Sequence, residues 1–133
     1  MRVYVFGNKY VPEDAGAIEV AEGLRGAVDG VSFVFVEPNG DVPFANEERV
    51  VILDAVHGIR EVGLISGDAI DRFAPPPRAS AHDFDLAFQL TYLKKIGRLG
   101  EVYVVGIPQE GQVDYLRVIS IFRKLVAQDM QGS

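Results

Sequence analysis

Cysteine is absent from this sequence of 133 residues. Without it, the chain has no disulfide framework, thiolate zinc site, iron–sulfur ligation or cysteine nucleophile. Any metal ion must therefore be bound by aspartate, glutamate or histidine side chains.

An excess of positive charge and long hydrophobic runs are also missing. Thirteen Lys and Arg against nineteen Asp and Glu leave a net charge of −6, without the basic stripe that nucleic-acid binding requires. Apolar runs such as 50–53 have the length of a strand, far below the ~20 residues of a membrane span. The amino-terminal segment has one basic residue followed by a strand-like run, which is not the pattern of a signal peptide. We therefore expect a cytoplasmic protein that binds neither nucleic acid nor membrane.

What the sequence does contain is the composition of a globular protein. Hydrophobic residues make up 48% and charged residues 24%, and the length is that of one domain. No internal repeat and no linker divides the chain. We expect residues 1–133 to form a single domain, with a frayed tail at 128–133.

Short apolar runs alternate with segments of helical periodicity along the chain. The apolar runs predict strands at 2–6, 32–36, 49–54 and 101–107, and a weaker edge strand or hairpin within 64–73. Helices are predicted to begin near Pro12, at Asp83 and at Val113. The predicted buried stripe of the first helix is Ile18, Ala21, Leu24 and Val28, and that of the last is Leu116, Ile119, Ile121, Phe122, Leu125 and Val126. This alternation predicts an α/β fold, a three-layer α/β/α sandwich with a mostly parallel sheet of about five strands.

Three polar residues follow predicted strands or precede a predicted helix. Asp14 follows the first strand, Asp54 is the last residue of the third predicted strand, and His82 ends the loop before the second long helix. Ligands of open α/β sheets bind outside the carboxyl ends of the strands, where the strand order reverses. Two carboxylates and one imidazole suit a divalent ion that prefers mixed nitrogen and oxygen ligands. We therefore predict that these residues converge in an accessible cleft at that edge.

Each of these residues also has a structural explanation. Asp54 is also explained as a helix cap or a loop ion pair, Asp14 as an acid favoured in the first turn of a helix, and His82 as a surface histidine. His57 is interpreted as a loop residue near the site rather than a ligand. Because no G-x-S-x-G elbow, G-x-G-x-x-G or Walker motif is present, a serine triad or nucleotide binding has little support.

The segments that carry these residues resemble the [NiFe]-hydrogenase maturation endopeptidases. The resemblance runs from Arg2 to about Gln109. Its motifs are Gly7-Asn8 followed by Glu13-Asp14, then Asp54-Ala55, Ser80 with His82-Asp83, and the strand Val104–Ile107. Two segments depart from the family pattern. The second glycine that many members carry before Gly-Asn is absent from Val5–Asn8, and Glu37–Asp41 replaces a glycine-rich turn that helps to place the substrate, which leaves open which hydrogenase is processed.

The resemblance implies an endopeptidase that removes the C-terminal extension of a nickel-loaded [NiFe]-hydrogenase large-subunit precursor. The metal-contacting residues of the family correspond to Asp14, Asp54 and His82. The nickel belongs to the substrate, so no permanent cofactor is expected. Hydrolysis through a metal-polarised carbonyl, a metal-activated water or an aspartate acting as general base all remain open.

Two other functions remain open as well. One is a non-catalytic relative that binds the nickel-loaded subunit as an assembly factor. The other is a small α/β hydrolase or binding domain whose acids are structural.

Overall fold

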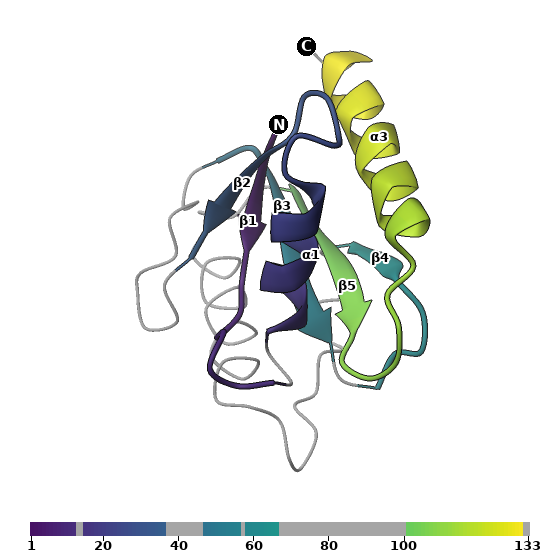
Figure 1. The fold of residues 1–133 in the computed structure, drawn as a ribbon. Coiled ribbons are helices and arrows are strands. Elements are labelled where there is room, and N and C mark those ends of the chain that lie inside the picture. Colours follow the sequence, from purple (N-terminus) through teal and green to yellow (C-terminus); the bar gives the residue numbers. More distant parts are fainter. Residues whose placement is uncertain (13–14, 37–46, 57, 67–100, 132–133) are drawn as a thin grey trace.

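The computed structural model describes residues 1–12, 15–36, 47–56, 58–66 and 101–131. These residues form a twisted sheet with helices packed against it (Figure 1). The strands are β1 (Arg2–Val5), β2 (Ser32–Phe35), β3 (Arg49–Val56), β4 (Gly63–Ser66) and β5 (Glu101–Pro108), and the helices are α1 (Gly16–Leu24) and α3 (Tyr115–Gln131).

The strand order of the sheet is β2-β1-β3-β5-β4. β2, β1, β3 and β5 are parallel, whereas β4 pairs with β5 in the antiparallel direction at one edge. These pairings confirm the predicted α/β class, the mostly parallel five-stranded sheet and the edge strand within 64–73. Because β2 and β3 lie on opposite sides of β1, the strand order reverses between β1 and β3.

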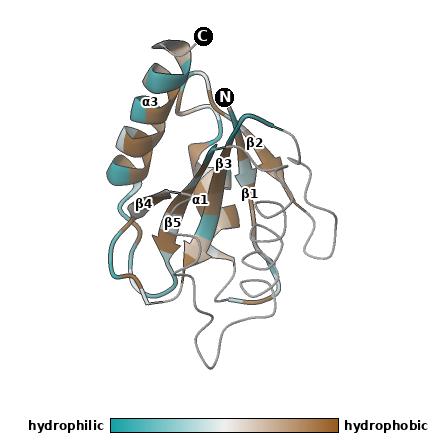
Figure 2. Ribbon diagram, turned by 180° about the vertical axis from the view of Figure 1, so that it is seen from behind, coloured by the Kyte–Doolittle hydropathy of each residue, from teal (hydrophilic) through white to brown (hydrophobic). Residues whose placement is uncertain are grey.

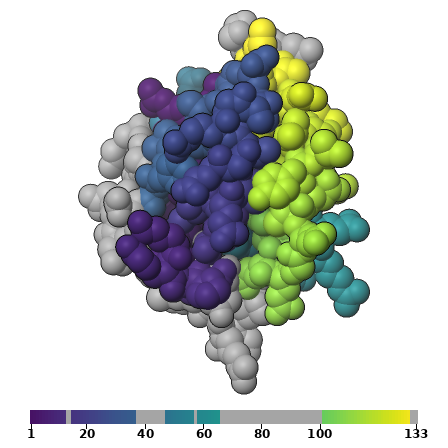
Figure 3. Space-filling view, viewed as in Figure 1, coloured from purple at the N-terminus to yellow at the C-terminus, as the bar shows by residue number. Residues whose placement is uncertain are grey.

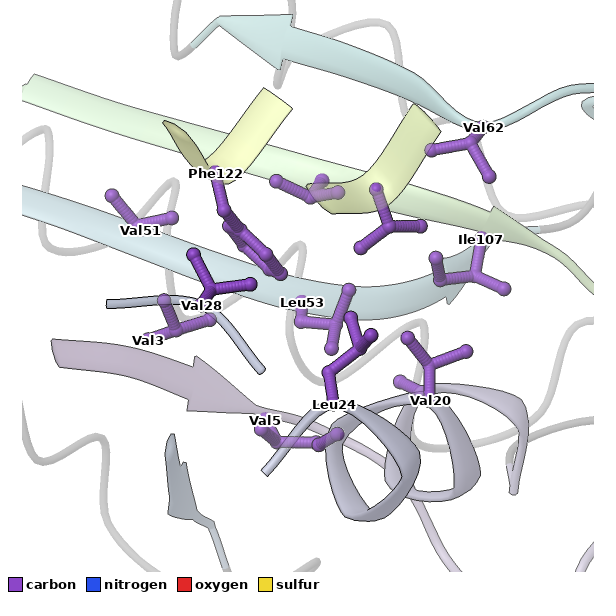
Figure 4. Packing of buried hydrophobic residues seen from close by; sticks show 14 of the residues in the cluster. Val3, Val5, Val20, Leu24, Val28, Val51, Leu53, Val62, Ile107 and Phe122 are labelled. Atoms are coloured by element: carbon purple, nitrogen blue, oxygen red, sulfur yellow. The ribbon is translucent and has the colours of Figure 1, made fainter. Parts of the chain in front are cut away.

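One face of the sheet is covered by α1 and α3 (Figure 1). The side chains that meet there are apolar, and Figure 4 shows Val20 and Leu24 of α1 and Phe122 of α3 packed over strand residues such as Leu53. The ring of Phe122 is fully buried and meets Phe33 of β2 edge to face, with ring centroids 5.8 Å apart. Burial of these side chains is the main force that holds the two helices to the sheet.

The opposite face of the sheet carries a second cluster of buried side chains. It consists of Tyr4, Phe6, Val50, Ile52, Val102 and Val104. Figure 2 shows the molecule from behind, with central strands that are mostly hydrophobic and an α3 whose colour changes between turns. The helix predicted at 83–96, which would cover this face as the third layer, lies outside the described residues.

The buried residues of α1 differ in part from the predicted stripe. They are Ala17, Val20, Ala21 and Leu24, whereas Ile18 is only half-buried. The helix ends at Leu24, and Gly26 follows with φ +77°, a left-handed conformation that ends helices readily. Val28 is buried as predicted, but it lies beyond the helix.

The prediction for α3 was wrong about one core residue. Leu116 is 79% exposed, and Val118 is fully buried in its place. Two residues along a helix turn the side chain by about 200°, so these residues lie on opposite sides of α3. The buried residues Val118, Phe122 and Leu125 follow the helical spacing of four and three. None of the described helices is long and apolar enough to cross a bilayer.

The carboxyl end of α3 also differs, because the helix continues to Gln131 through residues that were predicted to fray. Arg49, the first residue of β3, donates hydrogen bonds to the side chains of Gln128 and Asp129 and to the carbonyl of Leu125. Its guanidinium carbon also lies 5.1 Å from the ring centroid of Tyr103. These contacts bind the last turns of α3 to the amino end of the sheet.

Candidate functional site

Asp54 is the single buried charged residue in the described part of the chain, with 5% of its surface exposed. The prediction that it ends its strand was wrong, because β3 continues to Val56. The reason is that β5 runs alongside for the same distance and pairs Ala55 with Ile107 and Val56 with Pro108. Asp54 is therefore held within a paired strand close to its carboxyl end.

The alternation of side chains along β3 determines which face Asp54 occupies. Val51 and Leu53 belong to the cluster under α1 and α3, and Val50 and Ile52 belong to the opposite cluster. Asp54 shares the parity of Val50 and Ile52 and lies on their face. It therefore lies on the face opposite to α1.

The first turn of α1 lies against the other face of the same strand end. A Cβ atom placed on Gly16 would lie 4.0 Å from the Cβ of Ala55 and 3.9 Å from Cγ2 of Ile107. Asp54 and the amino end of α1 thus flank the carboxyl end of β3 from two sides. A ligand that contacts both must lie over the edge of the sheet, beyond the strand ends.

The β1–α1 connection begins beside Asp54. Val5 pairs with Leu53, and the backbone N–H of Phe6 donates to the carbonyl of Leu53 at 3.0 Å. Because β1 and β3 are the strands between which the order reverses, this is the place where open α/β sheets bind ligands. The structure therefore places Asp54 at the predicted edge of the sheet.

Gly106 lies directly opposite Asp54 in β5. A Cβ atom at this position would lie 3.1 Å from Cδ1 of Ile59 and 3.2 Å from Cγ2 of Val56, both tighter than ordinary contact. The glycine therefore lets Ile59, from the loop after β3, pack closely beside the strand that carries Asp54. Gly106 was not predicted as a site residue, although a glycine inside a buried strand signals such a close approach.

The loop that follows β1 has a defined local structure. Oδ1 of Asn8 accepts a hydrogen bond from the backbone N–H of Tyr10 at 3.0 Å, and the carbonyl of Asn8 accepts one from Val11 at 3.0 Å. An asparagine side chain that bonds two residues ahead stabilises a tight turn. Tyr10, which was not among the predicted site residues, lies in this turn and is 82% exposed.

The remaining predicted site residues, Asp14, His57 and His82, lie outside the described residues. Their convergence with Asp54, and their capacity to bind a metal ion, stay predictions. Within ranges 1–12, 15–36, 47–56, 58–66 and 101–131, no three histidine or acidic side chains gather into a metal-binding group. Asp54 is a candidate site residue because its carboxylate lies near the carboxyl end of the parallel strands, beside the reversal of their order.

The sequence matches no protein-family model and no curated protein. Its structure, however, is similar to solved structures of hydrogenase maturation enzymes. The hydrogenase maturating endopeptidase HybD from E. coli matches with a TM-score of 0.65 and 19% identity, over 99% of this chain and 93% of that one. The [NiFe] hydrogenase maturation protease HybD from Thermococcus kodakarensis matches with a TM-score of 0.59 and 21% identity, over 95% and 99% of the two chains.

A third match is an endopeptidase from Escherichia coli, with a TM-score of 0.63 and 17% identity, over 98% of this chain and 90% of that one. Together these matches cover nearly the whole chain and confirm that it has the fold of the hydrogenase maturation proteases, as the resemblance in sequence implied. A fold supports several functions, so the function has to be argued from the site.

Proposed function

We propose that this chain is an endopeptidase that acts in the cytoplasm and removes the C-terminal extension of a nickel-loaded [NiFe]-hydrogenase large-subunit precursor. The observation that carries the proposal is the position of Asp54. It is a buried carboxylate beside the point of strand-order reversal, in a fold shared over nearly the full chain with maturation proteases.

The nickel of the substrate is proposed to contact Asp14, Asp54 and His82. Two carboxylates and one imidazole leave coordination positions open, so they suit a metal ion that arrives already bound to another protein. Asp14 belongs to the connection that starts beside Asp54, which supports their proximity. Because the metal comes with the precursor, the protease needs no metal of its own, and contact with nickel reports that the precursor is loaded.

The reaction adds water across one peptide bond, which separates the extension from the mature subunit. A general base takes a proton from the attacking water, and the leaving amine gains a proton. An aspartate of the site is suited to the first role. The substrate's nickel is suited to polarise the scissile carbonyl or to lower the pKa of the water. The polarised carbonyl, the metal-activated water and the aspartate base all use the same three residues, and the proposal includes each of these routes.

The test is to incubate the purified chain with the large-subunit precursor, either nickel-loaded or nickel-free, and to measure the mass of the precursor. We expect a shortened product from the nickel-loaded form alone. Asp14→Asn, Asp54→Asn and His82→Ala should each abolish the product while thermal melting shows a folded protein. His57→Ala is the control and should keep its activity. Full activity of Asp54→Asn or His82→Ala would contradict the assignment.

The same experiment separates the two alternatives. A chain that binds the nickel-loaded subunit in a pull-down without shortening it is an assembly factor. A chain that neither binds nor cuts either form is a small α/β domain whose acids are structural. Loss of activity together with loss of folding in the three variants would likewise support structural acids.

A further inference from the structure

Tyr10 is the most exposed of the large hydrophobic side chains in the described part of the chain, at 82%. At this exposure the ring contributes little to the folded core, so stability does not explain an aromatic residue here. A large aromatic side chain held out into solvent is, however, a frequent centre of protein recognition. Its position in the fold then decides what it recognises.

The loop that carries Tyr10 leaves the sheet next to Asp54. The backbone N–H of Phe6 bonds to the carbonyl of Leu53, so the loop starts at the reversal of strand order. Figure 3 shows the purple atoms of the segment that follows β1 at the lower left, beside the blue surface of α1. Tyr10 therefore lies on the loop that starts at the candidate site.

A local hydrogen bond fixes the backbone of the loop at Tyr10. The side chain of Asn8 accepts from the N–H of Tyr10 at 3.0 Å, which fixes the turn that holds the residue. The ammonium of Lys9 lies 5.2 Å from the centroid of the Tyr10 ring, so one face of the ring carries a cation. A loop backbone fixed in this way loses less conformational entropy on binding than a mobile one.

We propose that Tyr10, supported by Lys9, is a substrate-recognition residue that packs against an apolar side chain of the precursor a few residues from the scissile bond. This inference rests on the proposed function. Tyr10 follows Phe6 by four positions, so its Cα lies at most about 14 Å from that of Phe6, whose N–H bonds to the carbonyl of Leu53, the neighbour of Asp54. An extended peptide with its scissile bond at the site covers that distance in about four residues. The partner is therefore the polypeptide that flanks the cut.

The first test compares Tyr10→Ala with Leu116→Ala in cleavage of the nickel-loaded large-subunit precursor. Leu116 is a matched control, because it is equally exposed, at 79%, but lies on α3. We expect Tyr10→Ala to raise KM about tenfold with little change in kcat, as for a binding hot spot. Tyr10→Phe should keep most of the affinity, and Leu116→Ala should behave as the wild type. Equal KM values for Tyr10→Ala and Leu116→Ala would overturn the inference and leave the proposed function intact.

A second measurement separates the inference from the proposed function. Calorimetry measures how tightly the wild type and Tyr10→Ala bind the nickel-free precursor, which we expect not to be cut. A loss of affinity of about tenfold supports recognition by Tyr10, even if the wild type fails to cleave the nickel-loaded form and the proposed function falls. Equal affinities overturn the inference. Absence of both binding and cleavage in the wild type overturns both.

Discussion

The two ends of β3 each hold a charged side chain away from solvent, but in different ways. At the amino end, the side chain of Arg49 is 18% exposed and contacts Asp129, Gln128 and the ring of Tyr103. Near the carboxyl end, Asp54 is 5% exposed on a face whose clustered strand residues are predominantly apolar. The same strand therefore carries one charge that joins the sheet to a helix and a second charge at the edge where open α/β sheets bind ligands.

The comparison teaches that burial of a charge does not by itself indicate function. Arg49 is explained by its contacts, because it donates hydrogen bonds to Gln128 and Asp129 of α3 and lies over the ring of Tyr103. Asp54 lies at the carboxyl end of the parallel strands and next to the reversal of their order. The difference between the two positions, and not the burial, makes Asp54 the candidate for chemistry.

The largest effect is expected from Asp54→Asn. The amide has almost the same shape as the carboxylate, but it accepts no proton and is a weak metal ligand. We expect cleavage of the nickel-loaded precursor to fall by about 10³-fold or more, with a melting temperature close to that of the wild type. Asp129→Asn is the matched control at the other end of β3, since the same change at a half-exposed residue should leave cleavage unchanged and cost at most about 1 kcal/mol of stability. Wild-type turnover by Asp54→Asn would show that the reaction does not need Asp54, and the two ends of β3 would then not differ in function.

Phe122→Ala measures how strongly apolar contacts alone hold α3. The side chain is fully buried and packs on Phe33, so its removal leaves a cavity under the helix. We expect the free energy of unfolding, measured in urea, to fall by about 3–5 kcal/mol. Leu116→Ala, on the exposed side of the same helix, should change it by less than about 0.5 kcal/mol. A cost of under about 1 kcal/mol for Phe122→Ala would mean that polar contacts such as those of Arg49 hold the helix instead.

Arg49→Met should have a smaller effect, confined to stability. Methionine keeps the apolar stem but loses the ion pair with Asp129 and the contact with the Tyr103 ring. Because Asp129 is half-exposed, the ion pair contributes only about 0.2–1 kcal/mol. Nε of Arg49 is buried without a hydrogen-bond partner among the described residues, and its removal offsets part of the loss. We expect a net loss of about 1 kcal/mol in urea unfolding and unchanged kcat/KM. A fall in kcat/KM would show that this end also serves the reaction.

The smallest effect concerns Tyr4, a polar group on the same face as Asp54. Burial, and then its hydrogen bond to Glu47, raise the pKa of the Tyr4 hydroxyl above its ordinary value of 10.0. The folded protein therefore retains this proton when the unfolded chain has lost it. Stability is unaffected below pH 10 and falls as the pH rises from there through the raised pKa.

Melting temperatures at a series of pH values from 9 to above 11 test this expectation. Tyr4→Phe has no hydroxyl to titrate, so its melting temperature should fall less steeply with pH than that of the wild type. Glu47→Gln removes one of the causes of the raised pKa and should have an intermediate slope. Identical slopes in the wild type and Tyr4→Phe would contradict a raised pKa.

Much of the fold and part of the site were predictable from the sequence. Runs such as Arg49 to Asp54 predicted buried strands, because a strand covered on both faces must be apolar throughout. The alternation of strands and helices predicted the α/β class and a mostly parallel sheet. The same logic placed Asp54 at the carboxyl edge. Where Asp14 and His82 lie relative to it stays a prediction of the sequence.

The tertiary structure decided what depends on partners distant in the chain. β3 extends past Asp54 because β5 pairs with it as far as Pro108. Asp54 lies on the face opposite to α1 because α1 and α3 pack on Val51 and Leu53. Val118 replaces Leu116 in the core because the rotation of α3 follows from its packing on the sheet. Local sequence reports which residues are apolar and at what spacing. Strand pairing and helix rotation depend on contacts between residues far apart in the chain, which spacing alone does not contain.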